Sequence, residues 1–171
     1  MSLLAKWLRP RSDPRDALRP LWHRTVEIAR EREWYADCGI ADSVAGRFDA
    51  ITLILAIVLI RMEREPDLIE PSVRLTELFV DDMDGQLRQG GVGDLMVGKH
   101  IGKLMSTLGG RLGAYRTALE EGEDSMAAAV TRNVTMTEHG DPGRLARRAR
   151  AFAAGLALVP GYRVLAAEIG K

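Results

Sequence analysis

The chain has 171 residues, of which 46% are hydrophobic and 28% charged, and its formal net charge is zero. This is the composition of one ordinary globular domain that is long enough to bury a core. The single cysteine, Cys38, excludes an internal disulfide, and the three histidines lie too far apart in sequence for a zinc motif. We expect one domain in a reducing compartment, with no metal and no cofactor.

The charges are distributed unevenly along the chain. Residues 1–25 carry six Lys or Arg against two Asp, residues 139–171 carry six basic against two acidic residues, and the segment between them carries twelve against twenty. Two interpretations are open. Either these are ordinary solvated faces, or the basic ends contact anionic lipid or RNA while the acidic centre contacts a basic partner.

We expect residues 1–12 to be a basic amphipathic segment in front of a single helical domain at 13–171. The segment has an apolar cluster around Trp7 but no long apolar core before a cleavage site, so it does not resemble a secretory signal. It either lies on a membrane surface or forms a short helix that packs back on the domain. The longest apolar run, Ile51 to Ile60, is half the roughly 20 residues that a bilayer span needs, which indicates a buried core helix.

Apolar residues recur at helical spacing from end to end, which predicts an all-α bundle of about six to eight helices around a central apolar helix. Pro66 and Pro71 are expected to bracket a break. The predicted helices run from Asp13-Pro14 to Cys38-Gly39, from Asp42-Ser43 to Met62, and over about 72–89, 95–120, 123–137 and 142–158, with a last piece after Pro160-Gly161.

The predicted helix at 95–120 contains several glycines, each of which costs roughly 0.5–1 kcal/mol relative to alanine in a helix interior. Close approach of another backbone is the expected reason. The neighbour is either another helix of this chain or a helix of a partner. The glycines are Gly102, Gly109, Gly110 and Gly113.

Residues 79–119 form a predicted helical hairpin around a tight glycine turn. The stretch from Gly93 to His100 is one residue short of a phosphate-binding loop. That motif requires a preceding strand and a hydroxyl residue that ligates magnesium, and here a polar helix precedes and His100 takes the hydroxyl position. We therefore interpret Asp94 as an N-cap of the second helix.

Two charged clusters have more than one interpretation. Asp81, Asp82 and Asp84 form either a solvated face with local pairs, a protein-docking surface, or a divalent-metal or catalytic carboxylate pair. A basic stripe near the C-terminus is either a solvated face or a phosphate-binding surface. It consists of Arg144, Arg147, Arg148 and Arg150.

Taken together, these residues resemble the ubiquinol–cytochrome c reductase chaperone family over about residues 18–120. The resemblance begins with Ala29-Arg30, Trp34-Tyr35, Gly39-Ile40-Ala41-Asp42 and Gly46-Arg47-Phe48-Asp49. It is most specific in the hairpin, at Phe79, Asp82-Met83-Asp84, Leu87-Arg88, Gly91-Val92-Gly93-Asp94-Leu95, Val97, Lys99, Met105, Gly110-Arg111, Ala114-Tyr115 and Ala118-Leu119. The chain departs from the family pattern at Ile54, Gln89-Gly90 and Leu108.

The resemblance implies an assembly chaperone for respiratory complex III and not an enzyme. Its partners would be newly made cytochrome b or another nascent subunit, a second assembly factor or the ribosome, with no DNA. A bacterial chain without a transit peptide would act in the cytoplasm, either free or peripheral at the inner membrane. The residues expected to bind a partner are Asp82, Met83, Asp84, Arg88, Val92, Gly93, Asp94, Lys99, Arg111 and Tyr115.

Two alternatives stay open. One is an enzyme that binds a small ligand or a metal through Gly93–His100 or through the Asp81, Asp82 and Asp84 cluster. The other is a membrane-surface protein with no specific client.

Overall fold

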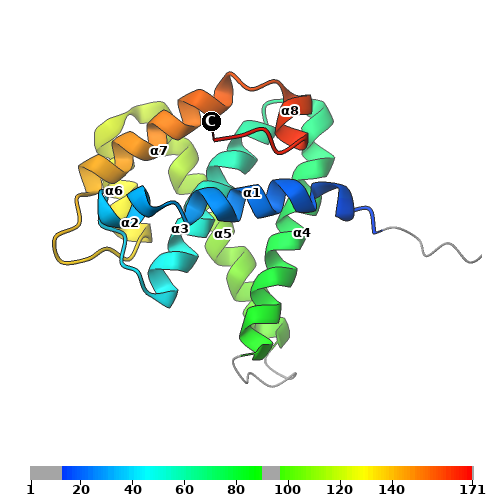
Figure 1. The fold of residues 1–171 in the computed structure, drawn as a ribbon, viewed down its shortest axis with the longest axis horizontal. Coiled ribbons are helices and arrows are strands. Elements are labelled where there is room, and N and C mark those ends of the chain that lie inside the picture. Colours follow the sequence, from blue (N-terminus) through cyan, green and yellow to red (C-terminus); the bar gives the residue numbers. More distant parts are fainter. Residues whose placement is uncertain (1–12, 90–96, 171) are drawn as a thin grey trace, which may run out of the picture.

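The computed structural model describes residues 13–89 and 97–170, except for the side chains of residues 86–89 and 97–100. Over these ranges the chain folds into a single bundle of α-helices, as predicted, with one short 3-10 helix and one isolated β-bridge (Figure 1). The elements are η2 (Asp16–Leu18), α1 (Arg19–Ala29), α2 (Arg32–Ala36), α3 (Val44–Met62), α4 (Pro66–Gln89), α5 (Val97–Glu121), α6 (Glu123–Asn133), α7 (Pro142–Ala157) and α8 (Gly161–Leu165).

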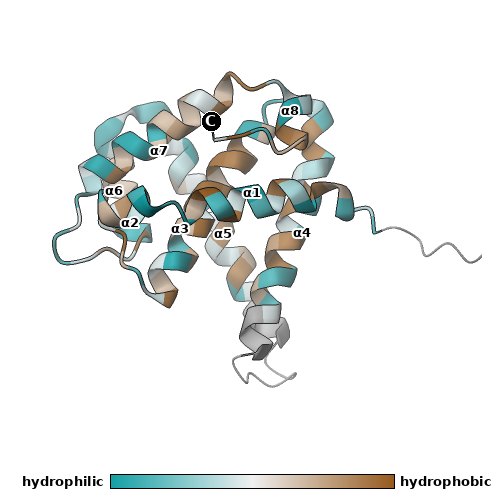
Figure 2. Ribbon diagram, viewed as in Figure 1, coloured by the Kyte–Doolittle hydropathy of each residue, from teal (hydrophilic) through white to brown (hydrophobic). Residues whose placement is uncertain are grey.

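Helix α3 is the predicted central helix. The Ser43 hydroxyl caps its N-terminus by accepting a hydrogen bond from the Gly46 amide at 3.1 Å. Every residue from Asp49 to Met62 is buried, because α1, α4, α5 and α7 pack around it, and its apolar middle is visible in Figure 2. Within the described ranges, no helix combines the length and hydropathy that a membrane crossing requires.

The first predicted helix is divided into two, because the chain turns at Arg30 and Glu31 between α1 and α2. The turn carries Trp34 back against α1, where its indole Nε1 donates to the Ile28 carbonyl oxygen at 2.7 Å. The Tyr35 hydroxyl donates to the Ala29 carbonyl oxygen at 2.9 Å. The Ile28 carbonyl oxygen also accepts from the Glu31 amide at 3.1 Å. Both side chains thus bond to carbonyls at the end of α1, where helical partners run out, and Trp34 becomes almost fully buried.

The predicted break between Pro66 and Pro71 is wrong, because α4 begins at Pro66 and contains Pro71. Proline at the first helical position is tolerated, since that amide would have no partner inside the helix. Pro71 does remove a helical hydrogen bond. The helix nevertheless continues across it because Leu68, in the turn before Pro71, is buried in the core.

A close backbone contact closes the bundle at Gly39 and Gly140. The Ala41 amide donates to the Thr135 carbonyl oxygen at 2.9 Å, and the Thr137 amide donates to the Gly39 carbonyl oxygen at 2.8 Å. Gly39 has a φ of +80°, and a Cβ there would lie 2.4 Å from the Gly140 Cα. Only glycine meets both conditions, which is why this residue ends the α2 segment.

Candidate docking surface on the α4–α5 hairpin

Helices α4 and α5 run in opposite directions and pack against each other, as the hairpin prediction requires. Their adjoining ends project beyond the rest of the bundle (Figure 1). Residues 90–96, which connect them, lie outside the described residues. The hypotheses about Val92, Gly93, Asp94 and the phosphate-loop-like segment therefore have no structural counterpart here.

The inner faces of both helices belong to the core. On α4, Leu75, Phe79 and Met83 are buried, and the Phe79 ring meets Trp22 of α1 edge-on with 6.0 Å between centroids. On α5, Tyr115 is fully buried, and burial raises the pKa of its hydroxyl. Met83 and Tyr115, which the sequence suggested as partner-binding residues, are therefore core residues, and only a change in the packing of the hairpin could carry their influence to its surface.

A buried ion pair fixes α5 to α3. The Arg111 guanidinium lies 2.6 Å from the Asp49 carboxylate, and the two side chains are 13% and 8% exposed. The second carboxylate oxygen accepts hydrogen bonds from the Thr135 amide at 2.8 Å and the Thr135 hydroxyl at 2.7 Å. Arg111 also contacts the Thr52 hydroxyl and lies over the Phe48 ring, 5.4 Å from its centroid. Arg111 thus orients the hairpin from inside.

The glycines of α5 do not mark close packing within this chain. A Cβ built at Gly102, Gly109, Gly110 or Gly113 would meet no atom within 4 Å. The expectation that another helix of the chain packs against them is therefore wrong, because the neighbours of α5 pack on its other faces. Of the two neighbours expected from the sequence, a helix contributed by a partner is the one that remains.

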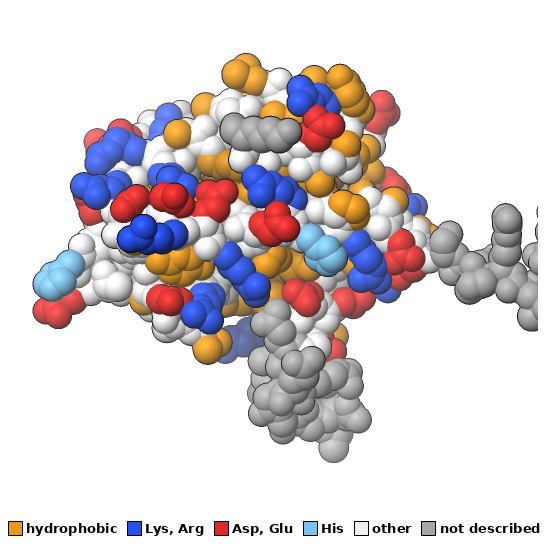
Figure 3. Space-filling view, viewed as in Figure 1, with side chains coloured by type: hydrophobic (Ala, Val, Ile, Leu, Met, Phe, Trp, Pro, Cys, Tyr) orange, Lys and Arg blue, Asp and Glu red, His pale blue; other side chains and the backbone are white. Residues whose placement is uncertain are grey.

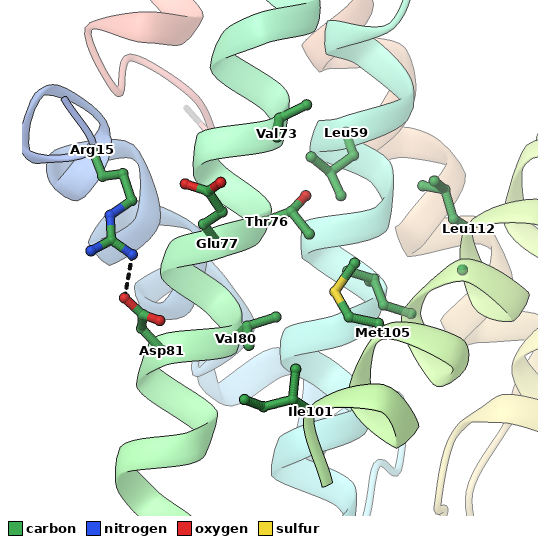
Figure 4. A pocket seen from close by; sticks show the side chains of 12 residues that line it. Arg15, Leu59, Val73, Thr76, Glu77, Val80, Asp81, Ile101, Met105 and Leu112 are labelled. Carbon is green, nitrogen blue, oxygen red and sulfur yellow. Dashed lines mark hydrogen bonds and ion pairs between the residues drawn. The ribbon is translucent and has the colours of Figure 1, made fainter. Parts of the chain in front are cut away.

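An apolar groove runs along the open side between α4 and α5 (Figure 4). It has a volume of about 570 Å³. Two of its apolar side chains are unusually open to solvent, Val73 at 55% and Met105 at 44%. The groove is lined by Leu59, Val73, Thr76, Val80, Ile101, Met105, Leu108, Gly109 and Leu112, with Arg15, Glu77 and Asp81 at its edge.

The edge of the groove on α4 is acidic. Asp81 forms an ion pair with Arg15, which precedes η2, and Arg15 also contacts Asp13 at 2.7 Å. Hydrogen bonds from Arg15 lower the pKa of Asp13 to about 2. Asp82 is exposed and Asp84 half-buried on the same helix. Among the side chains that the structure describes, no three from His, Cys, Asp or Glu converge in a way that could hold a metal ion.

The structure thus brings together only some of the predicted site residues. Asp82 is exposed and Asp84 half-buried on α4, whereas Met83 and Tyr115 are buried and the Arg111 side chain is largely covered by its contact with Asp49. The side chains of Arg88 and Lys99 lie outside the described residues. The sequence predicted the helix at 95–120 but not the groove along it. Ile101, Met105, Leu108 and Leu112 have the spacing of an ordinary core-facing stripe, so the sequence carries no signal that part of it stays open.

The basic stripe of α7 is largely engaged within the chain. Arg147 pairs with Glu123 at 2.7 Å, and Arg148 pairs with Glu31 at 3.0 Å while stacking over Trp34 at 4.4 Å. Arg150 donates to the Leu119 carbonyl oxygen at 3.0 Å. Figure 3 shows basic side chains interspersed with acidic ones on the face it presents. This arrangement favours an internal bracing role over phosphate binding.

A helical bundle with an open apolar groove and an acidic edge has the surface of a protein-binding module. The chain belongs to the ubiquinol–cytochrome c chaperone family, whose model matches residues 36–168. A solved structure described as the Cbp3 homolog from Brucella abortus is similar, with 27% sequence identity and a TM-score of 0.81. The similarity covers 99% of this chain and 96% of that one. No curated protein matches the chain.

Proposed function

We propose that this protein is an assembly chaperone for the cytochrome bc complex, respiratory complex III, and that it binds newly made cytochrome b or a companion assembly factor through the hairpin at 79–119. Family membership supports the chaperone role. The observation that carries the binding site is the apolar groove between α4 and α5, whose wall includes the exposed side chains of Val73 and Met105.

The chemistry of the groove suits a segment of a membrane protein before insertion. Such a segment is apolar and must be shielded from water, and each Å² of apolar surface buried contributes about 25 cal/mol. An amphipathic helix laid into an apolar groove is a common mode of recognition. The bare helix surface at Gly109 allows a client backbone to approach α5 closely. Met105 adds a side chain that adapts to different apolar surfaces.

The charged residues of the hairpin would orient the client. We assign this role to Asp82, Asp84, Arg88, Asp94 and Lys99, and we include Val92 and Gly93 in the proposed binding set. Acidic groups beside the groove favour a client whose apolar segment is flanked by basic residues, as cytoplasmic loops of membrane proteins commonly are.

We place the protein in a bacterial cytoplasm, peripheral at the inner membrane. The basic ends of the chain favour contact with anionic lipid or with ribosomal RNA. A second assembly factor or the ribosome would then be close to the nascent client. No DNA partner is proposed.

Substitution of Gly109 by leucine tests the groove. Gly109 lines it, and a side chain at this position meets no atom of the chain within 4 Å. Gly109→Leu should therefore fill the groove without disturbing the fold, and we expect recovery of cytochrome b with the affinity-purified chaperone to fall about tenfold, equivalent to ~1.4 kcal/mol. Assembled complex III should fall with it, measured as quinol–cytochrome c reductase activity of the membranes.

Gly110→Leu is the matched control. Gly110 is the next residue on the same helix, equally open, and does not line the groove. Both variants replace a helix glycine and should gain about 0.5–1 kcal/mol of stability. If Gly109→Leu and Gly110→Leu recover cytochrome b equally well, the groove is not the docking site.

A further inference from the structure

We propose that residues 1–12 of the same chain occupy the α4–α5 groove as an amphipathic segment when no client is bound. The segment would then act as a tethered competitor that a client must displace. The competition with a client rests on the proposed function. Whether residues 1–12 occupy the groove is tested separately.

The described chain begins at the edge of the groove. Asp13, Pro14 and Arg15 line a shallow depression of about 300 Å³, and Val73 and Glu77 belong both to this depression and to the groove. Arg15 is held there by Asp13 and by Asp81, the latter contact being drawn in Figure 4. Residues 1–12 are therefore anchored beside the groove by their covalent continuation.

The chain is long enough to reach from this anchor into the groove. Residues 10–12 span about 10 Å when extended, which is about the diameter of the single helix, α4, that separates the anchor from the groove. Pro10 disfavours helix at the residue before it, so a helical segment would end there. As a helix, residues 3–9 would be about 10 Å long. The stretch of α4 that lines the groove, from Val73 to Val80, has about the same length.

The side chains of the segment complement the groove. Leu4, Trp7 and Leu8 have the i, i+3, i+4 spacing that places apolar residues on one face of a helix. The cations of the segment, Lys6, Arg9 and Arg11, would lie near Glu77 of α4. The neighbouring carboxylates of Glu70 and Asp81 already pair with Arg74 and Arg15. An exposed apolar groove and an apolar, basic segment tethered at its edge thus form a complementary pair.

The tether makes even a weak interaction effective. A short flexible connection holds a tethered ligand at an effective concentration in the millimolar range. If the segment covers the groove in about nine molecules out of ten, a client binds with about one tenth of its intrinsic affinity. Displacing the segment from the groove restores the full affinity.

Methyl NMR of the full-length protein tests the occupancy. In protein labelled on methionine methyl groups, with the Met105 signal assigned through Met105→Leu, we expect Trp7→Ala to shift the Met105 resonance because the indole ring leaves the groove. Ser2→Ala, in the same segment, is the control and should leave it unchanged. An unchanged Met105 signal in Trp7→Ala overturns the proposal.

Two further measurements identify other occupants. If the effect of Trp7→Ala on Met105 disappears on dilution, the segment comes from a second copy, and occupation in cis is wrong. If Trp7 fluorescence shifts to the blue on phosphatidylglycerol vesicles while Trp7→Ala leaves Met105 unchanged in their absence, the segment is a membrane anchor, which also overturns the proposal.

Client capture separates this inference from the proposed function. With both correct, Trp7→Ala should increase cytochrome b recovery about tenfold, and Gly109→Leu should abolish the increase. If Met105 responds to Trp7→Ala but Gly109→Leu leaves recovery unchanged, the groove is occupied in cis and the client binds elsewhere. If Gly109→Leu lowers recovery but Met105 does not respond, the groove binds the client and the segment does not cover it.

Discussion

Among single residues, Asp49 and Arg111 decide where α5 lies on the bundle. Asp49 is buried and Arg111 largely so, and each has the other and at least one hydroxyl as a partner. Such a pair is a weak source of net stability compared with an apolar pair. Removing one charge is costly, because the other is left buried without compensation.

We expect Asp49→Asn to lower the free energy of unfolding by about 3–5 kcal/mol, because it leaves the Arg111 charge buried without its counter-ion. Urea denaturation followed by circular dichroism measures the change. Glu63→Gln is the control, since it breaks the 2.7 Å ion pair with Arg116, whose side chains are both at least 40% exposed. That loss should stay below about 1 kcal/mol. Equal losses in the two variants would contradict the importance assigned to burial.

The contact between Arg15 and Asp13 predicts a specific acid dependence. The pKa of Asp13 falls from an ordinary 3.8 to about 2 because the Arg15 side chain and amide donate hydrogen bonds to it. A carboxylate with a depressed pKa stabilises the fold fully above its unfolded pKa and loses that contribution as the pH falls through the folded pKa. Wild type should therefore melt above Asp13→Asn at pH 7 and pH 5.

The melting-temperature difference between wild type and Asp13→Asn should shrink between about pH 4 and pH 2. Differential scanning calorimetry over this range is the measurement. A difference that stays constant down to pH 2, or that grows toward acid, would show that the contact between Arg15 and Asp13 does not contribute in this way.

At the level of elements, α4 shows that burial can override a local helix breaker. A proline inside a helix lowers the free energy of unfolding by about 3 kcal/mol. It also restricts the unfolded chain, and replacing it gives up that benefit, which is at most about 1 kcal/mol. We therefore expect Pro71→Ala to stabilise the protein by about 2 kcal/mol, measured by urea denaturation. Pro66→Ala should change little, because Pro66 begins the helix. No gain for Pro71→Ala would mean that its ring makes compensating contacts.

The glycines of α5 lie on a face of the helix that no other element of the described chain covers. Their helix is predictable from the apolar spacing, but which of its faces stays open is not, because that depends on where α3, α4 and α6 pack. Glycine on an exposed helix face costs stability without an internal benefit. Under the proposed function, that cost is connected to the groove beside Gly109.

For the whole molecule, α3 makes the bundle cooperative. Since α1, α4, α5 and α7 all contact it, none of them can leave without exposing part of its buried stretch from Asp49 to Met62. We expect unfolding by urea to give the same midpoint by circular dichroism at 222 nm and by fluorescence of the two core tryptophans, Trp22 and Trp34. The measurement uses a Trp7→Phe background so that residues 1–12 do not contribute. Separate midpoints would mean that α1 and α2 unfold independently of the other helices.

The amino-acid sequence alone was sufficient for the features that are encoded locally. Helical periodicity predicted the all-α class, the central helix and the extents of α5 and α7, and the ordered residues of the hairpin indicated the family. Local preferences wrongly predicted a break at Pro71, where burial of Leu68 keeps the helix continuous. They also wrongly predicted one continuous helix where the chain turns between α1 and α2 and buries Trp34.

Only the tertiary structure decided which residues of the hairpin face inward and which line the groove. Arg111 meets Asp49 across 62 residues of sequence, and Arg15 meets Asp81 across 66. Such contacts depend on how distant helices pack, and a helical spacing in one segment carries no information about its neighbours. The sequence therefore located the hairpin, and the packing of α3, α4 and α5 determined that an apolar groove remains open along it.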